Sequence, residues 1–301
     1  MKDTALNAAD KSLNIEAMTT CTREPYVAGK FYPGTKDGIV RLIDSIRDQN
    51  PYTGTSKLRI ENLIGVVLPH AGHIYSGYQT VPFFEILNYN HIEFDSFVIL
   101  HPLHQGGYHA YATDNCSEWV TPLGKLVVDR KFVDELDIHH SDHLLKFEHS
   151  AEVILPFIQY FGYGDKAIIP IGISSQTPDT AQEIANKINQ ASVRTGRKIC
   201  IIASSDFSHF LSPDEGSKKD EKVLQHIVKF ETEEVYHTII TNNISICGYG
   251  PIMTLMYFAS RRYQDIQTNI IARGHSGQVN PSATVVDYIS ILFHSHSKIQ
   301  K

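Results

Sequence analysis

Pro69-His70-Ala71-Gly72-His73-Ile74-Tyr75-Ser76-Gly77 directly follows a short apolar run, residues 64–68. Such a run predicts a buried strand, and the proline ends it because proline has no N–H to give to a neighbouring strand. The two glycines allow tight turns. His70 is therefore expected on a loop at the carboxyl end of a strand, where open α/β sheets bind ligands. An imidazole there can ligate a metal or move protons, or it can simply satisfy a backbone carbonyl.

Two further strands are expected to run into histidine-bearing turns. Ser96–Leu100 leads into His101-Pro102-Leu103-His104, and Lys198–Ala203 leads into Ser204-Ser205-Asp206-Phe207-Ser208-His209. Cys247 lies just ahead of a helix expected to begin near Pro251, a position expected to lower the pKa of its thiol. Two of the imidazoles of His70, His104 and His209, together with the thiolate of Cys247, make a candidate three-ligand metal site with open coordination positions.

The remaining apolar patterns predict alternating strands and helices. Ala167–Ile173 reads as another strand, and residues 114–128 as a hairpin-like excursion. Helices are expected at residues 37–47, 77–87, 131–136, 177–194, 218–227, 231–242 and 253–262. This alternation predicts one α/β domain, residues 23–297, with a mainly parallel central sheet flanked by helices, after a flexible N-terminal segment, residues 1–22.

Residues 147–161 are expected to form a helix that is broken or kinked around Pro156. Glu148 and Glu152 are four residues apart and would share one face of that helix. They are interpreted as charges favoured by the helix dipole, with direct catalysis as the less favoured alternative.

Composition narrows the classes of function. The chain has 301 residues, 42% hydrophobic residues and a net charge of −6, which argues against a general nucleic-acid binder. It has no apolar run long enough to span a membrane, and no secretory signal is seen at its start. Its four cysteines are widely spaced, which is not the pattern of a disulfide framework, so we expect a reducing, cytoplasmic setting.

Taken together, these motifs resemble the Memo family, a branch related to the class III extradiol dioxygenases. The matching pieces occur in family order from about Arg23 to about Phe293. They are Val27-Ala28-Gly29-Lys30-Phe31-Tyr32-Pro33, Pro69-His70-Ala71-Gly72 with Tyr75-Ser76-Gly77, Pro102-Leu103-His104, Glu148-His149-Ser150-Ala151-Glu152, Ser204-Ser205-Asp206-Phe207-Ser208-His209 and Cys247-Gly248-Tyr249-Gly250-Pro251-Ile252.

The resemblance implies a class III extradiol dioxygenase-like α/β domain whose metal ligands are His70, His104 and Cys247. It further implies that His209, with Asp206 beside it, is an acid/base residue. The expected cofactor is one divalent metal, Fe(II) first and zinc or copper as alternatives, because Cys247 stands where the dioxygenases have a carboxylate and a thiolate softens the site.

His101 and His73 depart from the family pattern, which has glycine and tyrosine at these places. Both add an imidazole that either joins the pocket or points into solvent, and Glu148 and His149 are further pocket candidates.

Two functions are compatible with these residues. One is a non-haem iron, dioxygenase-like oxidoreductase acting on a small aromatic substrate, with His209 as proton shuttle. The other is a non-catalytic protein that uses the same pocket to bind a metal or a peptide. Retention of Asp206 and His209 favours the first, and the cysteine in place of a carboxylate favours the second. Metal-dependent hydrolysis is a third class, for which the sequence offers no nucleophile elbow and no extra carboxylate ligand.

Overall fold

Four parallel strands form the centre of the main sheet in the computed structural model, which describes residues 21–296. In spatial order they are β2 (Asn62–Leu68), β8 (Ile199–Ser204), β3 (Ser96–Pro102) and β7 (Ala167–Ile173). Antiparallel strands extend both edges: β11 (Val285–Ser295) and β10 (Ile266–His275) beyond β2, and β4 (Tyr111–Ala112) beyond β7. The expectation of a mixed α/β domain with a mainly parallel centre is confirmed.

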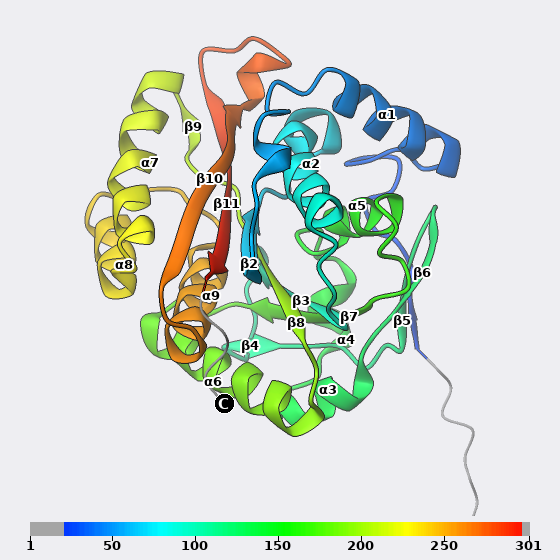
Figure 1. Cartoon of the computed structure of the whole chain (residues 1–301). Coiled ribbons are helices and arrows are strands. Elements are labelled where there is room, and N and C mark those ends of the chain that lie inside the picture. Colours follow the sequence, from blue (N-terminus) through cyan, green and yellow to red (C-terminus); the bar gives the residue numbers. More distant parts are fainter. Residues whose placement is uncertain (1–20, 297–301) are drawn as a thin grey trace, which may run out of the picture.

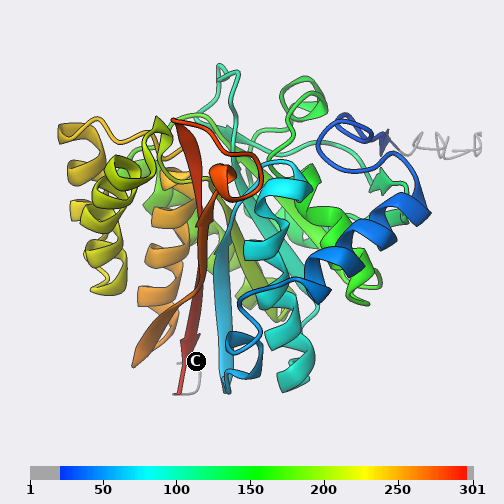
Figure 2. The same cartoon turned by 90° about the horizontal axis from the view of Figure 1, so that it is seen from above.

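Helices cover both faces of this sheet (Figures 1 and 2). On one face α9 (Tyr249–Arg262) packs on β2, β8 and β3, with α6 (Pro178–Thr195) and α3 (Arg130–Leu136) beyond it. On the other face α2 (His73–Asn90) packs on β10 and β11, with α1 (Lys36–Asp48) and α5 (Leu155–Tyr160) beside it. The other helices and 3-10 turns are α4 (Asp142–Lys146), α7 (Pro213–Val228), α8 (Thr232–Thr241), η1 (Thr55–Lys57), η2 (Glu152–Ile154) and η3 (Ser276–Gln278).

The central strands are buried on both sides, which explains their continuous apolar sequences. Gly65 is required within β2 because a Cβ there would lie 2.3 Å from the carbonyl oxygen of Ile201 on the neighbouring strand. Among the described residues, no helix combines the length and the apolar character that a membrane crossing requires.

Two element boundaries differ from the expected ones. β3 continues to Pro102, because its last residues pair with Gly172 and Ile173 of β7, so His101 is a strand residue and not part of a turn. α2 begins at His73 and not at residue 77, because the His73 N–H donates to the carbonyl oxygen of Phe31 and so needs no partner inside the helix.

The expected helix breaks near Pro156, and residues 147–151 before it are not helical. Pro156 lies in the first turn of the short helix α5, where its missing N–H costs nothing, and only η2 precedes it. Glu148 lies between α4 and η2, outside any helical turn, and Glu152 opens η2. The two carboxylates therefore do not share a helix face. The dipole interpretation is wrong for Glu148, whereas Glu152 does lie in the first turn of η2.

A small second sheet joins the start of the described chain to its middle. It contains β1 (Thr22–Arg23), β5 (Glu118–Thr121) and β6 (Gly124–Val127), and the last two form the expected hairpin. Because Thr22 pairs with Glu118, Cys21 lies beside the residues that lead into β5. A disulfide joins Cys21 to Cys116, two residues before that strand. This cross-link was not expected from the wide cysteine spacing. Residues 1–20 of the segment expected to be flexible lie outside the described residues, and so does residue 297 of the expected domain.

Candidate metal centre

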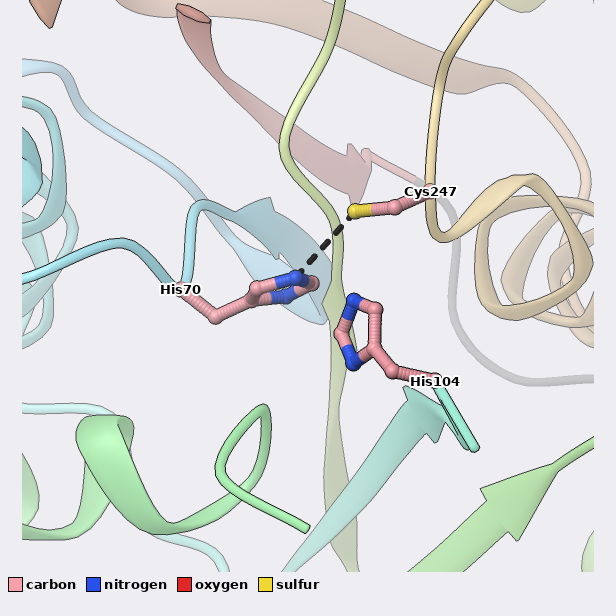
Figure 3. Close-up of side chains that lie close together, drawn as sticks. All are labelled: His70, His104 and Cys247. Carbon is pink, nitrogen blue, oxygen red and sulfur yellow. Dashed lines mark hydrogen bonds between the residues drawn. The ribbon is translucent and has the colours of Figure 1, made fainter. Parts of the chain in front are cut away.

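Three segments far apart in the sequence bring His70, His104 and Cys247 together. His70 follows β2, His104 follows β3, and Cys247 lies two residues before α9. Since β2 and β3 both flank β8 in parallel, their carboxyl ends open on the same edge of the sheet. One ligand atom from each of the three residues lies within 4.8 Å of the others. Figure 3 shows the Cys247 sulfur directed at the His70 ring, with 3.1 Å between Sγ and Nε2.

Gly248 permits this close approach of the cysteine. A Cβ at residue 248 would lie 2.2 Å from the carbonyl oxygen of Ser204, a backbone atom that has no room to move. The turn before α9 can therefore lie directly against the end of β8. The side chain of Gln176 also holds this turn, because its Nε2 donates to the Cys247 carbonyl oxygen at 2.8 Å and its Oε1 accepts from the Gly250 N–H at 2.7 Å.

Hydrogen bonds determine which nitrogen of His70 faces the sulfur. Ser204 Oγ lies 2.7 Å from His70 Nδ1 and also donates its proton to the carbonyl oxygen of Ser150 at 2.7 Å. Having used its own proton, the Ser204 hydroxyl accepts from an Nδ1–H of His70. The lone pair of His70 is then on Nε2, facing Cys247. Burial, followed by the charge of His104, holds the pKa of His70 well below its usual value, so the ring is neutral and suited to bind a cation.

Glu148 orients His104 in the same way. Its Oε1 accepts from His104 Nδ1 at 3.0 Å and its Oε2 accepts from the His104 backbone N–H at 2.8 Å, which leaves His104 Nε2 free. Burial by itself raises the pKa of Glu148, but the hydrogen bond from His104 and the neighbouring imidazoles bring it below its usual range. For His104, burial lowers the pKa and the Glu148 carboxylate more than reverses this, so the net shift is upward.

His149 lies against these groups. Its ring stacks on that of His104 with 4.8 Å between centroids, and its Nδ1 is 3.3 Å from Glu148 Oε1. His104, Glu148 and His149 thus form a second set of atoms close enough to hold a metal, which overlaps the first set at His104.

The thiol of Cys247 is not activated as its place before a helix had suggested. Burial raises its pKa well above the usual value, and the negative charge of Asp206 adds to this. These effects outweigh the backbone N–H of Asp206, which donates to the sulfur at 3.2 Å. A cation bound at the site would favour the deprotonation of Cys247.

Asp206 and His209, which the resemblance placed side by side, each form hydrogen bonds with other groups. Asp206 Oδ1 accepts from the backbone N–H of His70 at 2.8 Å, so this carboxylate fixes the loop that carries a candidate ligand. Burial raises the pKa of Asp206 to about 6. His209 Nδ1 lies 2.7 Å from the carbonyl oxygen of Ser245 and donates to it, which leaves Nε2 of this half-buried ring without a proton and able to accept one.

His73 and His101 are buried, and neither points into solvent. His73 Nε2 lies 2.7 Å from the carbonyl oxygen of Val153, and its ring stacks on Tyr32. His101 Nδ1 lies 3.0 Å from Ser150 Oγ. Burial lowers the pKa of each to about 4, so both are neutral at pH 7. Neither belongs to the groups of ligand atoms found among the described residues. They support the core behind the site.

Sequence reasoning missed the residues that orient the ligands, above all Ser204 and Ser150. The signal for Ser204 is a serine at the end of an apolar strand, where a hydroxyl is buried only if it has hydrogen-bond partners. Ser150 lies in a turn ahead of η2 and has no such signal. Arg23 was missed as well: its guanidinium forms a buried ion pair with Glu152 at 2.8 Å and donates to the Glu148 carbonyl oxygen at 2.7 Å.

A cavity of about 610 Å³ lies next to the candidate centre and reaches Glu148. Leu103, Leu144 and Phe147 give its wall apolar patches, and His109, His139 and His143 add imidazoles. It is large enough for an aromatic molecule or a short peptide segment.

Comparison with known proteins gives one family. A model of the family described as Memo-like protein matches residues 23–292. A MEMO1 family protein of Archaeoglobus fulgidus is 34% identical over 274 residues, covering 90% of this chain and 99% of that protein. One of Desulfurococcus amylolyticus is 39% identical over 249 residues, covering 79% and 87%. The solved structure of uncharacterized protein JW3007 from Escherichia coli K12 aligns with a TM-score of 0.45 at 11% identity, covering 75% of this chain and 98% of that one. The family match spans most of the chain and includes every residue of the candidate centre, so the protein belongs to the Memo family.

Proposed function

We propose that this protein binds one divalent metal through His70 Nε2, His104 Nε2 and Cys247 Sγ. The observation that carries the proposal is the convergence of these three ligand atoms within 4.8 Å of one another. The hydrogen bonds that His70 and His104 donate from Nδ1 to Ser204 and Glu148 support it, because they turn Nε2 of each ring towards the centre. The donor set suits Fe(II), with zinc and copper as alternatives that a thiolate favours.

The function that this centre supports best is that of a class III extradiol dioxygenase-like oxidoreductase acting on a small aromatic substrate. Bound Fe(II) would supply the redox chemistry with O2. The protein's own part is to hold the substrate in the cavity beside Glu148 and to move a proton. His209 is the residue for that step, because Ser245 holds its Nδ1–H and its Nε2 can accept a proton. Asp206 acts through the His70 loop. We also propose that the protein is cytoplasmic.

The second candidate is a metal- or peptide-binding protein without catalysis. The cysteine at the place where the related dioxygenases have a carboxylate favours this alternative, because a thiolate softens the ligand set. The two candidates share the metal ligands and differ in whether turnover exists.

Anaerobic purification, elemental analysis and an oxygen-uptake assay against a panel of catechols separate these candidates. Replacing His70, His104 or Cys247 with alanine should remove most of the bound metal. If all three variants keep the wild-type metal content, the proposed ligand set is wrong. Oxygen uptake that depends on a catechol supports the oxidoreductase, and metal binding without any turnover supports the binding protein.

His209→Gln tests the proton-transfer step. Metal content and thermal stability should stay at wild-type values, while turnover falls by about 10²-fold or more, as expected on loss of a general acid–base. Unchanged turnover would remove His209 from the mechanism, and loss of metal together with stability would make it a structural residue.

A further inference from the structure

A further group of potential metal ligands lies apart from the His70 centre and from the group that overlaps it at His104. It consists of Cys21, Cys116 and Asp142, whose ligand atoms lie within 4.8 Å of one another. In this structure the two sulfurs are bonded to each other. Asp142 is the first residue of α4, and its Oδ1 accepts from the backbone N–H of Asn115 at 2.7 Å. The carboxylate is thus held next to the cysteine that follows Asn115.

The surroundings leave room for a cation. Cys21, Cys116 and Asp142 line one cavity of about 400 Å³, so all three face a common space. Arg23 lines it too, but its guanidinium is committed to Glu152 and to two carbonyl oxygens, and it lies over the ring of Trp119. Among residues 21–296, Asp142 forms no ion pair, so its charge is not neutralised by a side chain.

The two cysteines would remain neighbours without their covalent bond. Thr22 pairs with Glu118 and Arg23 with Trp119, and the N–H of Ser117 donates to the Cys21 carbonyl oxygen at 2.9 Å. Reduction of the disulfide therefore releases two thiols that the backbone keeps facing each other, beside a fixed carboxylate.

We propose that reduced Cys21 and Cys116, together with Asp142, form a second metal site that takes a zinc-type divalent ion. The site is switched by oxidation state. Two molecules of a small thiol reduce the Cys21–Cys116 bond and become one disulfide, which leaves two protein thiols. When the ion binds, each thiol loses its proton to solvent. Two thiolates and one carboxylate leave a fourth tetrahedral position for water. The proposal is independent of the function assigned to the His70 centre.

The test counts zinc in a protein from which the first centre has been removed. His70→Ala/His104→Ala/Cys247→Ala protein lacks ligands of both the first centre and the overlapping His104, Glu148 and His149 group. It is equilibrated with zinc, either reduced with a phosphine or oxidised with diamide, then dialysed and analysed for metal. The reduced form should retain one zinc per chain, and the oxidised form should retain none. When Cys116→Ser is added to this variant, the reduced protein should no longer retain zinc. Asp142→Asn should weaken zinc binding by at least about tenfold. Loss of a residue that only hydrogen-bonds a metal ligand already costs about that much, and Asp142 is proposed as a ligand itself. Equal zinc in both redox states, or zinc that survives Cys116→Ser, overturns the proposal.

Cobalt(II) provides a second readout in the full chain with both centres intact. Reduced wild-type protein should show thiolate-to-cobalt absorption from both centres. Cys116→Ser should remove the part assigned to Cys21 and Cys116, and Cys247→Ala the part assigned to the first centre. If the proposal for the first centre is wrong and that for the second site is right, the Cys116-dependent absorption is still observed. Absence of a Cys116-dependent signal in folded, reduced protein contradicts the second site.

Discussion

Replacing Glu148 with glutamine tests the role of the carboxylate that orients His104. Glu148 Oε1 accepts from His104 Nδ1 and from the backbone N–H groups of His149 and Ser150, and Oε2 accepts from the His104 N–H. A glutamine has the same shape but only one carbonyl oxygen. In either orientation its NH2 faces at least one N–H donor, so the carboxamide cannot hold His104 as the carboxylate does.

The expected loss is in metal affinity. Removing the outer partner of a metal-bound histidine costs about 10–100-fold, which equals about 1.4–2.7 kcal/mol of binding free energy. We expect Glu148→Gln to weaken the metal Kd by this amount, measured by competition with a chromogenic chelator under anaerobic conditions. The folded fraction is measured in parallel by circular dichroism.

Glu152→Gln is the matched control. Glu152 is equally buried, but its oxygens bind Arg23, the backbone of residues 26 and 27, and Tyr32. Breaking a buried ion pair costs about 3–5 kcal/mol, so this variant should lose stability while its folded fraction binds metal with the wild-type Kd. The reasoning fails if Glu148→Gln keeps the wild-type Kd, or if Glu152→Gln weakens it equally.

Two further variants test the frame around the site. Burial, and after it the charge of Asp220, raises the pKa of Asp287 to about 7. The folded protein therefore binds a proton on Asp287 that the unfolded chain releases near pH 4. The stability that this proton contributes is present below about pH 4 and is lost as the pH rises towards 7. Asp287→Asn should flatten this decline in thermal melts across pH 4–8, and an unchanged slope would exclude the carboxyl as its source. Gly248→Ala forces a Cβ against the Ser204 carbonyl oxygen. It should lower the free energy of unfolding by about 1–3 kcal/mol and also weaken metal binding. Wild-type stability in thermal melts together with wild-type affinity in chelator titrations would refute the close approach.

The sequence was informative where a local pattern decides the structure. Apolar runs ending in Pro69 or in Ser204-Ser205 identified the parallel strands, because both faces of those strands are buried. The parallel arrangement in turn brings loops from distant segments to one edge, so His70 and His104 could be expected to meet. The distance between them, and the approach of Cys247 to Nε2 of His70, depend on packing at Gly248 that no local pattern reveals.

The partners of the polar side chains were not predictable in the same way. The resemblance placed Asp206 beside His209, three residues away, but its carboxylate accepts the N–H of His70 from a different strand end. Glu152 was expected at a helix start, and it also neutralises Arg23, which lies 129 residues earlier in the chain. The pairing of Cys21 with Cys116 likewise depends on strand register. Each of these contacts is long-range and is set only when the sheets have formed.

The central claim is a metal held by His70, His104 and Cys247, and an anomalous difference map tests it most directly. Crystals are grown anaerobically with Fe(II), and diffraction is recorded on both sides of the iron absorption edge. We expect a peak within about 2.5 Å of His70 Nε2, His104 Nε2 and Cys247 Sγ, as coordination distances require. Iron bound elsewhere, with no peak between these three atoms, would contradict the account.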